Sequence, residues 1–404
     1  MAEDRSSPTP DTVILDEPTL AKIVSKIQSL YDEGVPLFTR ESIRDVYEQL
    51  KESNGSGRQI SVRALDGTIV KYTLNVGSVC PGPEPHIEWV SETCRIHYQS
   101  IQSLTSPFFS TILVCECPSF LLCSMPISHP VSSRNIVTKE IISPFVVQPL
   151  EDVEVLFQKC MDAWRASQSW KQLRATLESI APLLRRPQLL SSDSRKNSTT
   201  KSQRTIDKVI GLACGNISLR HRTSTSDDSG SSLARRCATQ HALLLTMREV
   251  LDDVVSSNDC RDGGSEPTST RPRPTTLSEI KCYVQDPAYN DVDKTVLTGA
   301  GFTILQDPEA FLEIDDSTVL FSCAPNVPVR QIVAELARPA IMVWDRVKED
   351  TEEDKICGVR ATDPDSPRLR RMIREFYDEF EFPRDPENFV DLAVYVRKPT
   401  VPSD

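Results

Sequence analysis

The stretch that decides the fold runs from Val209 to Asn216 and has the sequence Val-Ile-Gly-Leu-Ala-Cys-Gly-Asn. Its first part, Val209–Ala213, is predicted to be a strand, because it is a short apolar run of the kind found in strands that are buried on both faces of a parallel sheet. A segment with helical periodicity follows it, from Ala234 to Val255. A buried strand followed by a long helix is the repeating unit of an open parallel sheet.

The same alternation continues as far as Trp344. Four further strands are predicted, at Cys282–Gln285, Phe302–Leu305, Thr318–Cys323 and Ile341–Trp344. Helices are predicted between them, at Val292–Leu297, which ends before Gly299 and Gly301, and at Val329–Leu336. The series predicts an α/β fold with a Rossmann-like, doubly wound and mostly parallel sheet.

The end of the chain is expected to complete this sheet. Ser366-Pro367 is predicted to begin a helix whose apolar face includes Leu369, Met372, Ile373, Phe376, Tyr377 and Phe380. Leu392, Val394 and Val396 then alternate with other residues as in a strand, which we expect to pair with the sheet edge. Two polar stretches, Arg220–Ser232 and Ser256–Thr276, are predicted to be mobile surface insertions.

Before this domain the pattern is of a different kind. Two amphipathic helices are predicted, the first capped by Thr19 and the second by Thr39. A β-hairpin around Asp66-Gly67 follows, because apolar residues alternate with polar ones on both sides of that turn. These features predict an N-terminal α+β companion region.

The composition changes define the expected domain boundaries. We expect a disordered start at 1–18, the α+β companion region at 19–150, a helical lead-in at 152–186 with Trp164 and Trp170 in the core, a linker at 187–204, the α/β domain at 205–346, and a C-terminal helix and strand at 347–404.

Charge and cysteine content limit the function classes. A formal net charge of -12 argues against nucleic acid as a partner, because that affinity depends on Lys and Arg. Twelve cysteines without a secreted-type spacing, and a start without a signal peptide, predict a reducing compartment, cytoplasmic or nuclear. The segment Phe108–Ile127 is interrupted by Glu116, Pro118 and Pro126, so a buried strand pair or irregular core segment is expected and no membrane span.

Candidate site residues lie where the predicted strands end, because ligands of open α/β sheets bind beyond the carboxyl ends of the strands. Gly215 and Asn216 follow the first strand, where a glycine lets the backbone approach a phosphate, ribose or carboxylate; a simple chain turn is the alternative. Asp286 and Asp307 follow the next two strands, and acidic side chains there can hold ribose hydroxyls. Each precedes a proline, so a structural turn is the alternative for both.

The fourth strand ends at Cys323, followed by Ala-Pro325-Asn326, which completes the candidate ligand-binding set. As a nucleophile Cys323 needs a base, yet none of the five histidines follows a predicted strand, and an inert buried thiol is the alternative. His241 lies within the first crossover helix, where a packed imidazole is the expected role. The spacing of Cys115, Cys117 and Cys123 does not fit zinc, so no metal site is predicted.

Several segments, in order, resemble the sensitivity-to-red-light-reduced-like domain family, of fungal type. They are Val209–Ser218, Ala234–Leu245 (Ala-Arg-Arg-Cys-Ala-Thr-Gln-His-Ala-Leu-Leu-Leu), Val284–Tyr289, Leu297–Leu305 and Thr318–Pro325. The segment Glu33–Thr39 is similar to the companion region of fungal members. Many members carry Pro-His-Cys after the fourth strand, where this chain has Ala324-Pro325-Asn326.

The resemblance implies regulation, since members are associated with light signalling and circadian timing in plants and with cytoskeletal or stress phenotypes in yeast. It brings no settled catalytic activity with it. Two hypotheses therefore stand. The first is a regulatory or adaptor protein with protein partners that binds a nucleoside-type ligand. The second is an enzyme that uses S-adenosylmethionine as a methyltransferase does, with Gly215, Asp286 and Asp307 as its site.

Overall fold

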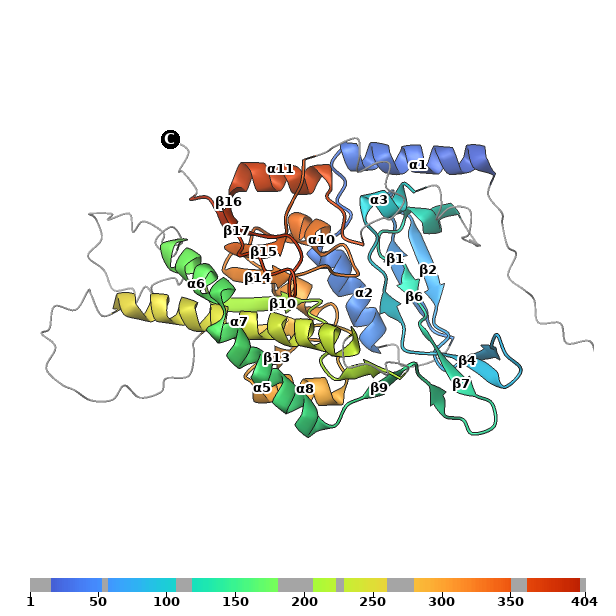
Figure 1. The fold of residues 1–404 in the computed structure, drawn as a ribbon. Coiled ribbons are helices and arrows are strands. Elements are labelled where there is room, and N and C mark those ends of the chain that lie inside the picture. The colour runs from blue at the N-terminus through green and yellow to red at the C-terminus, as the bar shows by residue number, and fades with distance from the viewer. Residues whose placement is uncertain are drawn as a thin grey trace, which may run out of the picture. The chain divides into compact units, whose positions relative to one another are not determined.

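The computed structural model describes residues 16–52, 57–106, 118–180, 206–222, 229–259, 280–349 and 362–399 (Figure 1). The chain divides into two compact units. The first takes Met1–Ser143, Arg330–Glu335 and Arg360–Ser366, and the second takes Pro144–Val329, Leu336–Val359 and Pro367–Asp404. The linker predicted at 187–204 lies outside the described residues.

The second unit is built on a seven-stranded, mostly parallel sheet. Its strands in spatial order are β13 (Thr303–Ile304), β12 (Lys281–Gln285), β10 (Lys208–Leu212), β14 (Thr318–Ser322), β15 (Ile341–Asp345), β17 (Leu392–Arg397) and β16 (Tyr377–Glu381). The first five run parallel to one another, and β17 is antiparallel to both of its neighbours. The predicted α/β class is therefore confirmed for this unit.

The first strand of the sheet in the sequence, β10, lies in the middle of the parallel part. The chain adds β12 and β13 on one side of β10 and then β14 and β15 on the other. A Cβ atom at Gly211 would lie 2.4 Å from Leu244 Cδ1, so glycine lets helix α7 (Ser229–Asp259) pack directly on the strand. Because the order of strand addition reverses after β13, the carboxyl ends of β10 and β14 lie side by side at the point of reversal.

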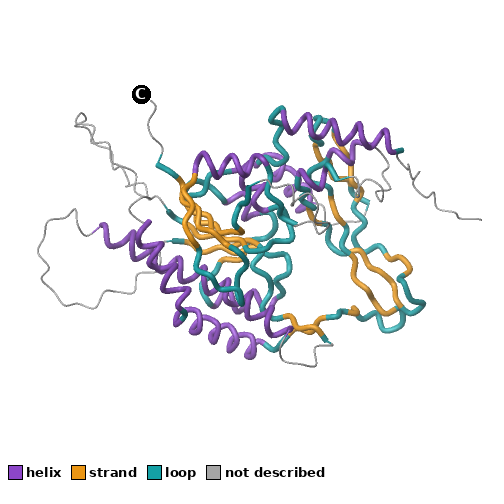
Figure 2. The backbone as a smooth tube through the Cα atoms, turned by 45° about the horizontal axis from the view of Figure 1, so that its top comes forward, coloured by secondary structure: helices purple, strands orange, loops and turns teal. Residues whose placement is uncertain are grey.

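Helices of the same unit pack along the sheet, as the purple and orange segments in Figure 2 show. They are α5 (Leu150–Ala166), α6 (Gln168–Ile180), α7, α8 (Asp291–Gly299), α9 (Glu309–Glu313) and α11 (Pro367–Phe376). Trp164 and Trp170 are buried in the core between them, as predicted, and Trp164 Nε1 donates to Thr246 Oγ1 of α7 over 2.9 Å.

The predicted C-terminal helix is too long. Helix α11 ends at Phe376, and Tyr377 to Glu381 form strand β16 instead. Tyr377 and Phe380 have helical spacing, but the antiparallel pairing with β17 takes precedence and buries Tyr377, whose hydroxyl donates to Pro339 O over 2.9 Å. Strand β17 pairs with β15 as the sequence suggested, yet β16 and not β17 forms the edge of the sheet.

Both predicted boundaries of the insertion at Arg220–Ser232 are wrong, because each end of it belongs to a regular element. Arg220 and His221 belong to β11 (Leu219–His221), which pairs antiparallel with β9 (Phe145–Val147), and α7 already begins at Ser229. Helix α7 also extends to Asp259, into the second predicted insertion. Residues 223–228 and 260–279 lie outside the described residues.

The first unit begins with helices α1 (Glu17–Asp32) and α2 (Arg40–Glu52) and the hairpin of β1 (Gln59–Arg63) and β2 (Ile69–Thr73). The hairpin and the cap at Thr39 are as predicted, since Thr39 Oγ1 accepts from Ser42 N over 3.0 Å. The predicted cap at Thr19 is wrong, because Asp16 caps α1 by accepting from Thr19 N over 2.9 Å.

A four-stranded antiparallel sheet in the first unit has no counterpart in the sequence prediction. Its strands are β3 (Val79–Pro81), β4 (Ile87–Ser91), β7 (Val131–Asn135) and β8 (Ile141–Ile142). The unit also contains β5 (Arg95–Ile96), α3 (Ile101–Leu104), η1 (Pro118–Leu122) and β6 (Ile127–Ser128). A core segment was expected at Phe108–Ile127. Its residues 108–117 lie outside the described residues, and its residues 118–127 contain η1 and the first residue of β6. Within the described ranges, no helix has the length and apolar character needed to cross a membrane.

Helix α10 (Val329–Leu336), which was predicted as a crossover helix, contributes Arg330–Glu335 to the first unit. There Arg330 Nε lies 3.0 Å from Asp363 Oδ2 and Arg330 Nη1 lies 2.7 Å from Asp365 Oδ1, in surroundings that bury all three side chains almost completely. Gln331 Oε1 accepts from Ile101 N over 3.1 Å. The first unit thus joins three separate parts of the sequence.

Candidate functional site

Four adjacent parallel strands end at the residues that the sequence singled out. Gly215 follows β10, Asp286 follows β12, Asp307 follows β13, and Cys323 follows β14 directly. Because the strands are parallel and neighbouring, all four positions lie along the carboxyl edge of one sheet.

Gly215 and Asp286 are in direct contact. Gly215 N donates to Asp286 Oδ2 over 2.7 Å, and Ala288 N donates to Asp286 Oδ1 over 2.8 Å. Burial raises the pKa of Asp286 above its ordinary value, while these two backbone donors partly offset that effect. The carboxylate therefore fixes the turn after β10, and the amide of Gly215 is not free to bind a phosphate.

The conformation at Gly215 requires a glycine. Its φ is +73°, and a Cβ atom there would lie 2.5 Å from Cys237 Sγ of α7. Asn216 acts locally, since its Oδ1 accepts from Leu219 N over 3.2 Å. The turn after β10 is thus held between α7 and the residues that follow β12.

Asp307 is connected to the same edge through Gln285, the last residue of β12. Gln285 Nε2 donates to Asp307 Oδ1 over 3.1 Å, and Gln285 Oε1 accepts from Ala310 N over 2.7 Å. The adjacent residues Gln285 and Asp286 therefore link the ends of β13 and β10.

The end of β14 lies on the other side of β10. Burial raises the pKa of Cys323 to about 11, so its thiol is protonated at neutral pH. Pro325 is buried and Asn326 is exposed. Ala324, between them and Cys323, has a φ of +48°, and Ala324 N donates to Asp345 Oδ1 over 3.3 Å.

A second alanine in this unusual conformation follows β10, where Ala213 has a φ of +55°. The left-handed region costs a non-glycine residue about 1–2 kcal/mol. Ala213 and Ala324 follow the two strands that flank the point where the order of the sheet reverses. Strained residues of this kind gather at ligand sites more often than elsewhere.

Sequence reasoning missed Asp293, whose carboxylate is completely buried in α8. Its Oδ1 accepts from Ile217 N and Ser218 N over 2.8 and 2.9 Å, and its Oδ2 accepts from Ser218 Oγ and Asn290 N, each over 3.1 Å. The signal was present, because Asn290 and Asp293 have the spacing of a capping box. Asp293 anchors the loop between β10 and β11.

His241 is buried and paired at both ring nitrogens. Nδ1 lies 2.6 Å from Cys237 O and must donate, so Nε2 accepts from the hydroxyl of Tyr289 at 2.7 Å. Burial lowers the pKa of His241 to about 4. The sequence predicted a packed imidazole, and the structure contains one, which these two bonds keep neutral.

The cysteine thiols near this edge of the sheet offer little reactive chemistry. The thiols of Cys237 and Cys282 have pKa values raised by burial to about 12, and burial raises that of Cys214 as well. Thiols in this state are poor nucleophiles. Within the described part of the chain no three His, Cys, Asp or Glu side chains are grouped as metal ligands.

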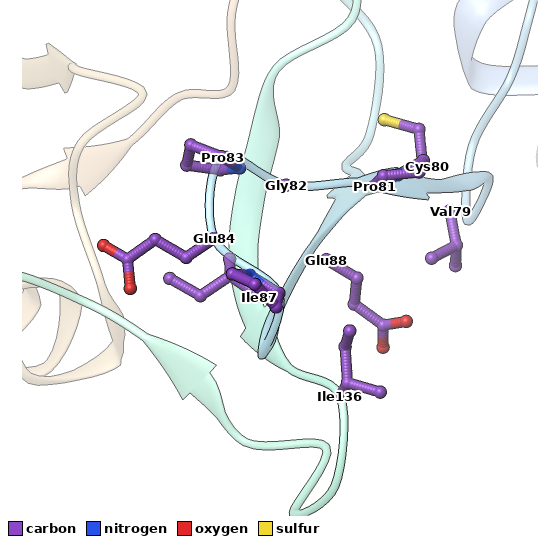
Figure 3. A pocket seen from close by; sticks show the side chains of 10 residues that line it. Val79, Cys80, Pro81, Gly82, Pro83, Glu84, Ile87, Glu88 and Ile136 are labelled. Carbon is purple, nitrogen blue, oxygen red and sulfur yellow. The ribbon is translucent and has the colours of Figure 1, made fainter.

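The first unit contains a separate groove of about 520 Å³ beside β3 and β4 (Figure 3). It is lined by Val79, Cys80, Pro81, Gly82, Pro83, Glu84, Pro85, Ile87, Glu88 and Ile136. Glu88 is neutralised by Arg134 Nε at 2.7 Å and by Lys139 Nζ at 3.0 Å. Glu84, which points away from Glu88 in Figure 3, pairs with His86 at 3.1 Å. The groove is mostly apolar, and its acidic groups already have partners.

Comparison with known families covers most of the second unit. The family model described as the SRR1 domain matches residues 173–396, which is more than half of the 404 residues. The match includes every strand end of the candidate site. No curated protein and no solved structure matches the chain. On the strength of the family match, which confirms the resemblance seen in the sequence, the chain belongs to the SRR1 domain family.

Proposed function

We propose that this SRR1 domain protein is a regulatory or adaptor protein whose Rossmann-like, doubly wound domain binds a nucleoside-type ligand at the carboxyl edge of its sheet. The strand order β13-β12-β10-β14-β15 supports the proposal, because it is the order 3-2-1-4-5 of dinucleotide-binding sheets. In such sheets the ligand lies outside the strands at the point where the order reverses.

The contact between Asp286 and Gly215 carries the proposal. A carboxylate offers roughly four acceptor positions, and the two backbone donors occupy one on each oxygen of Asp286. Two acceptor positions therefore remain beside a glycine turn, and ribose hydroxyls are donors that fill such positions. Their donation stabilises a carboxylate whose charged form burial disfavours.

Regulation is favoured over catalysis because the reactive side chains near the edge are inert or engaged. Cys323 is a protonated thiol, and His241 is held by Cys237 O and Tyr289. The runner-up hypothesis is transfer of a methyl group from S-adenosylmethionine, which the acids after β12 and β13 favour. In that case S-adenosylmethionine binds at the same carboxyl edge of the sheet as the proposed regulatory ligand.

Partners and location follow from composition and family. The acidic chain, with a net charge of -12, acts through protein partners and not through nucleic acid, and it works in the cytoplasm or the nucleus. Its regulatory role agrees with membership of the SRR1 domain family.

Calorimetric titration of the full chain with adenosine and with S-adenosylhomocysteine tests the proposal. We expect Asp286→Asn to weaken binding of both by at least about tenfold, because a hydrogen bond to a charged group contributes about 1.5–3 kcal/mol. Asp291→Asn is the matched control, since that carboxylate on α8 is fully exposed. Wild-type protein that binds neither probe contradicts the proposal.

Mass spectrometry separates the two hypotheses. Wild-type protein is incubated with S-adenosylmethionine and cell extract, and the conversion of the ligand to S-adenosylhomocysteine is followed. A regulatory binder leaves the ligand unchanged. Conversion that Asp286→Asn abolishes and Asp291→Asn preserves favours the methyltransferase.

A further inference from the structure

Two side chains at the candidate site each have a buried polar atom without a hydrogen-bond partner among the described residues, Gln240 of α7 and Ser322 at the end of β14. Gln240 of α7 is 8% exposed, and its Oε1 is buried with no hydrogen bond to any described residue. An orphaned buried amide costs folding free energy, and native structures keep few of them. Such a group needs an explanation, and a ligand or water that bonds to it is one.

Gln240 lies at the level of the carboxyl edge. Three residues before it, Cys237 is the side chain that a Cβ atom at Gly215 would meet; four residues after it, Leu244 is the one that a Cβ atom at Gly211 would meet. The helix therefore runs along the end of β10 and the loop beyond it. The next residue, His241, packs against Tyr289 and Phe302 on the β12 side, so Gln240, one residue earlier on the helix, lies on the β14 side of the line through Cys237 and Leu244.

Arg236, one helical turn before Gln240, faces the same side of α7. Its Nε donates to Glu387 O over 2.8 Å and its Nη2 donates to Pro386 O over 3.4 Å. Three of its five N–H donors thus have no bond among the described residues. Its partners Pro386 and Glu387 precede Phe389, whose ring centroid lies 6.3 Å from that of Phe321 of β14, so Arg236 lies toward β14.

The two halves of the edge differ in chemistry. On the β12 side of Gly215, Asp286 presents acceptors; on the β14 side, Arg236 presents donors and a positive charge, and Gln240 presents an amide. A ligand that spans the edge needs hydroxyl donors at one end. At the other end it needs an anion together with an N–H donor.

We propose that Arg236 and Gln240 form a second subsite and that the ligand is a nucleoside carrying a zwitterionic α-amino acid tail. The inference rests on the proposed nucleoside site and deepens it. The tail carboxylate pairs with Arg236, and the tail ammonium donates to Gln240 Oε1. An amino acid supplies both a donor and acceptors, so it satisfies the amide in either orientation. An ionised phosphate supplies acceptors alone.

Binding of three probes to wild type and variants tests the subsite: S-adenosylhomocysteine, adenosine and adenosine monophosphate. Wild type is expected to bind S-adenosylhomocysteine at least about tenfold more tightly than either of the others, the size of one charge-assisted contact. Gln240→Leu and Arg236→Gln are each expected to remove that advantage and to leave the affinity for adenosine unchanged. Arg236→Lys is expected to recover part of it, because the charge remains.

The melting temperature without ligand distinguishes a ligand-binding glutamine from one that stabilises the fold, because replacing a stabilising glutamine would lower it. Gln240→Leu replaces an unsatisfied amide by an apolar side chain of similar size, so it is expected to raise the melting temperature by about 2 °C. Gln172→Leu on the exposed face of α6 is the control and is expected to leave both the melting temperature and binding unchanged.

Two outcomes overturn the subsite alone. The first is a lower melting temperature for Gln240→Leu than for wild type. The second is a preference for S-adenosylhomocysteine that Gln240→Leu and Arg236→Gln both retain, while Asp286→Asn still weakens adenosine binding. Failure of wild type to bind any of the three probes overturns the subsite and the nucleoside site together.

Discussion

At the scale of single residues, Gly215 shows how one position sets the geometry of the edge. Its positive φ and its distance to Cys237 are two separate constraints. Gly215→Ala is expected to lower the free energy of unfolding by about 2–3 kcal/mol, of which the left-handed conformation accounts for about 1–2. Urea denaturation measures the change.

A double-mutant cycle separates the two constraints. The Cβ atom of Cys237 would lie 3.7 Å from a Cβ atom at position 215, which is an ordinary contact. In a Cys237→Ala background, Gly215→Ala should therefore cost only the conformational strain, about 1 kcal/mol less than in wild type. Equal costs in both backgrounds would show that the sulfur does not confine the glycine.

His241 makes the stability depend on pH. The pKa of its folded form is about 4, below the value of about 6.5 in the unfolded chain, so the unfolded state takes up the proton first as the pH falls. Its contribution is complete above pH 6.5 and is lost between about pH 6.5 and 4, by about 3 kcal/mol. Urea denaturation across this range should show a shallower decline for His241→Gln than for wild type. Parallel curves would contradict the assignment.

At the scale of secondary structure, the buried strands were the predictable part. Strands β10, β12, β14 and β15 are short apolar runs, and all four are found within a residue or two of their predicted bounds. The exposed sheet of the first unit was not predictable in this way. Its strand β3 is exposed at every residue, so no alternation of burial marks it.

Helix α11 and strand β16 show a second limit. Tyr377 and Phe380 fit the helical spacing of α11, and only the pairing of β16 with β17 decides between the two structures. Tertiary contacts of this kind leave no local signal. The candidate site shows the same limit. The sequence predicted which residues follow the strands. It did not predict the hydrogen bonds of Asp286 with Gly215 and of Gln285 with Asp307, because those depend on the order of the strands in the sheet.

Asp293 connects two elements, because α8 holds the loop that leads from β10 to β11 through this carboxylate. Asp293→Ala leaves the buried N–H groups of Ile217 and Ser218 without acceptors and is expected to cost about 3 kcal/mol. Chemical denaturation should show less than about 1 kcal/mol for Asp291→Ala, which removes an exposed carboxylate two residues earlier in the same helix. Similar losses for both variants would rule out the anchoring role.

At the scale of the whole molecule, the two units offer different chemistry to a ligand. In the α/β unit, acceptors and a glycine turn follow neighbouring strands, and helix α7 carries an unpaired buried amide oxygen at Gln240. The first unit has an apolar groove whose carboxylates are already paired. The edge offers the hydrogen-bonding groups that a nucleoside needs, and the groove does not.

Hydrogen–deuterium exchange of the full chain, with and without saturating S-adenosylhomocysteine, tests this central claim most directly. The proposed site predicts added protection in the peptides that contain Ala213 to Ile217, Gln285 to Tyr289, and Arg236 to Gln240. At a ligand concentration near the wild-type Kd, Asp286→Asn should lose most of that protection, and Asp291→Asn should keep it. Protection confined to the groove around Val79 to Glu88, with the edge of the sheet unchanged, would contradict the account.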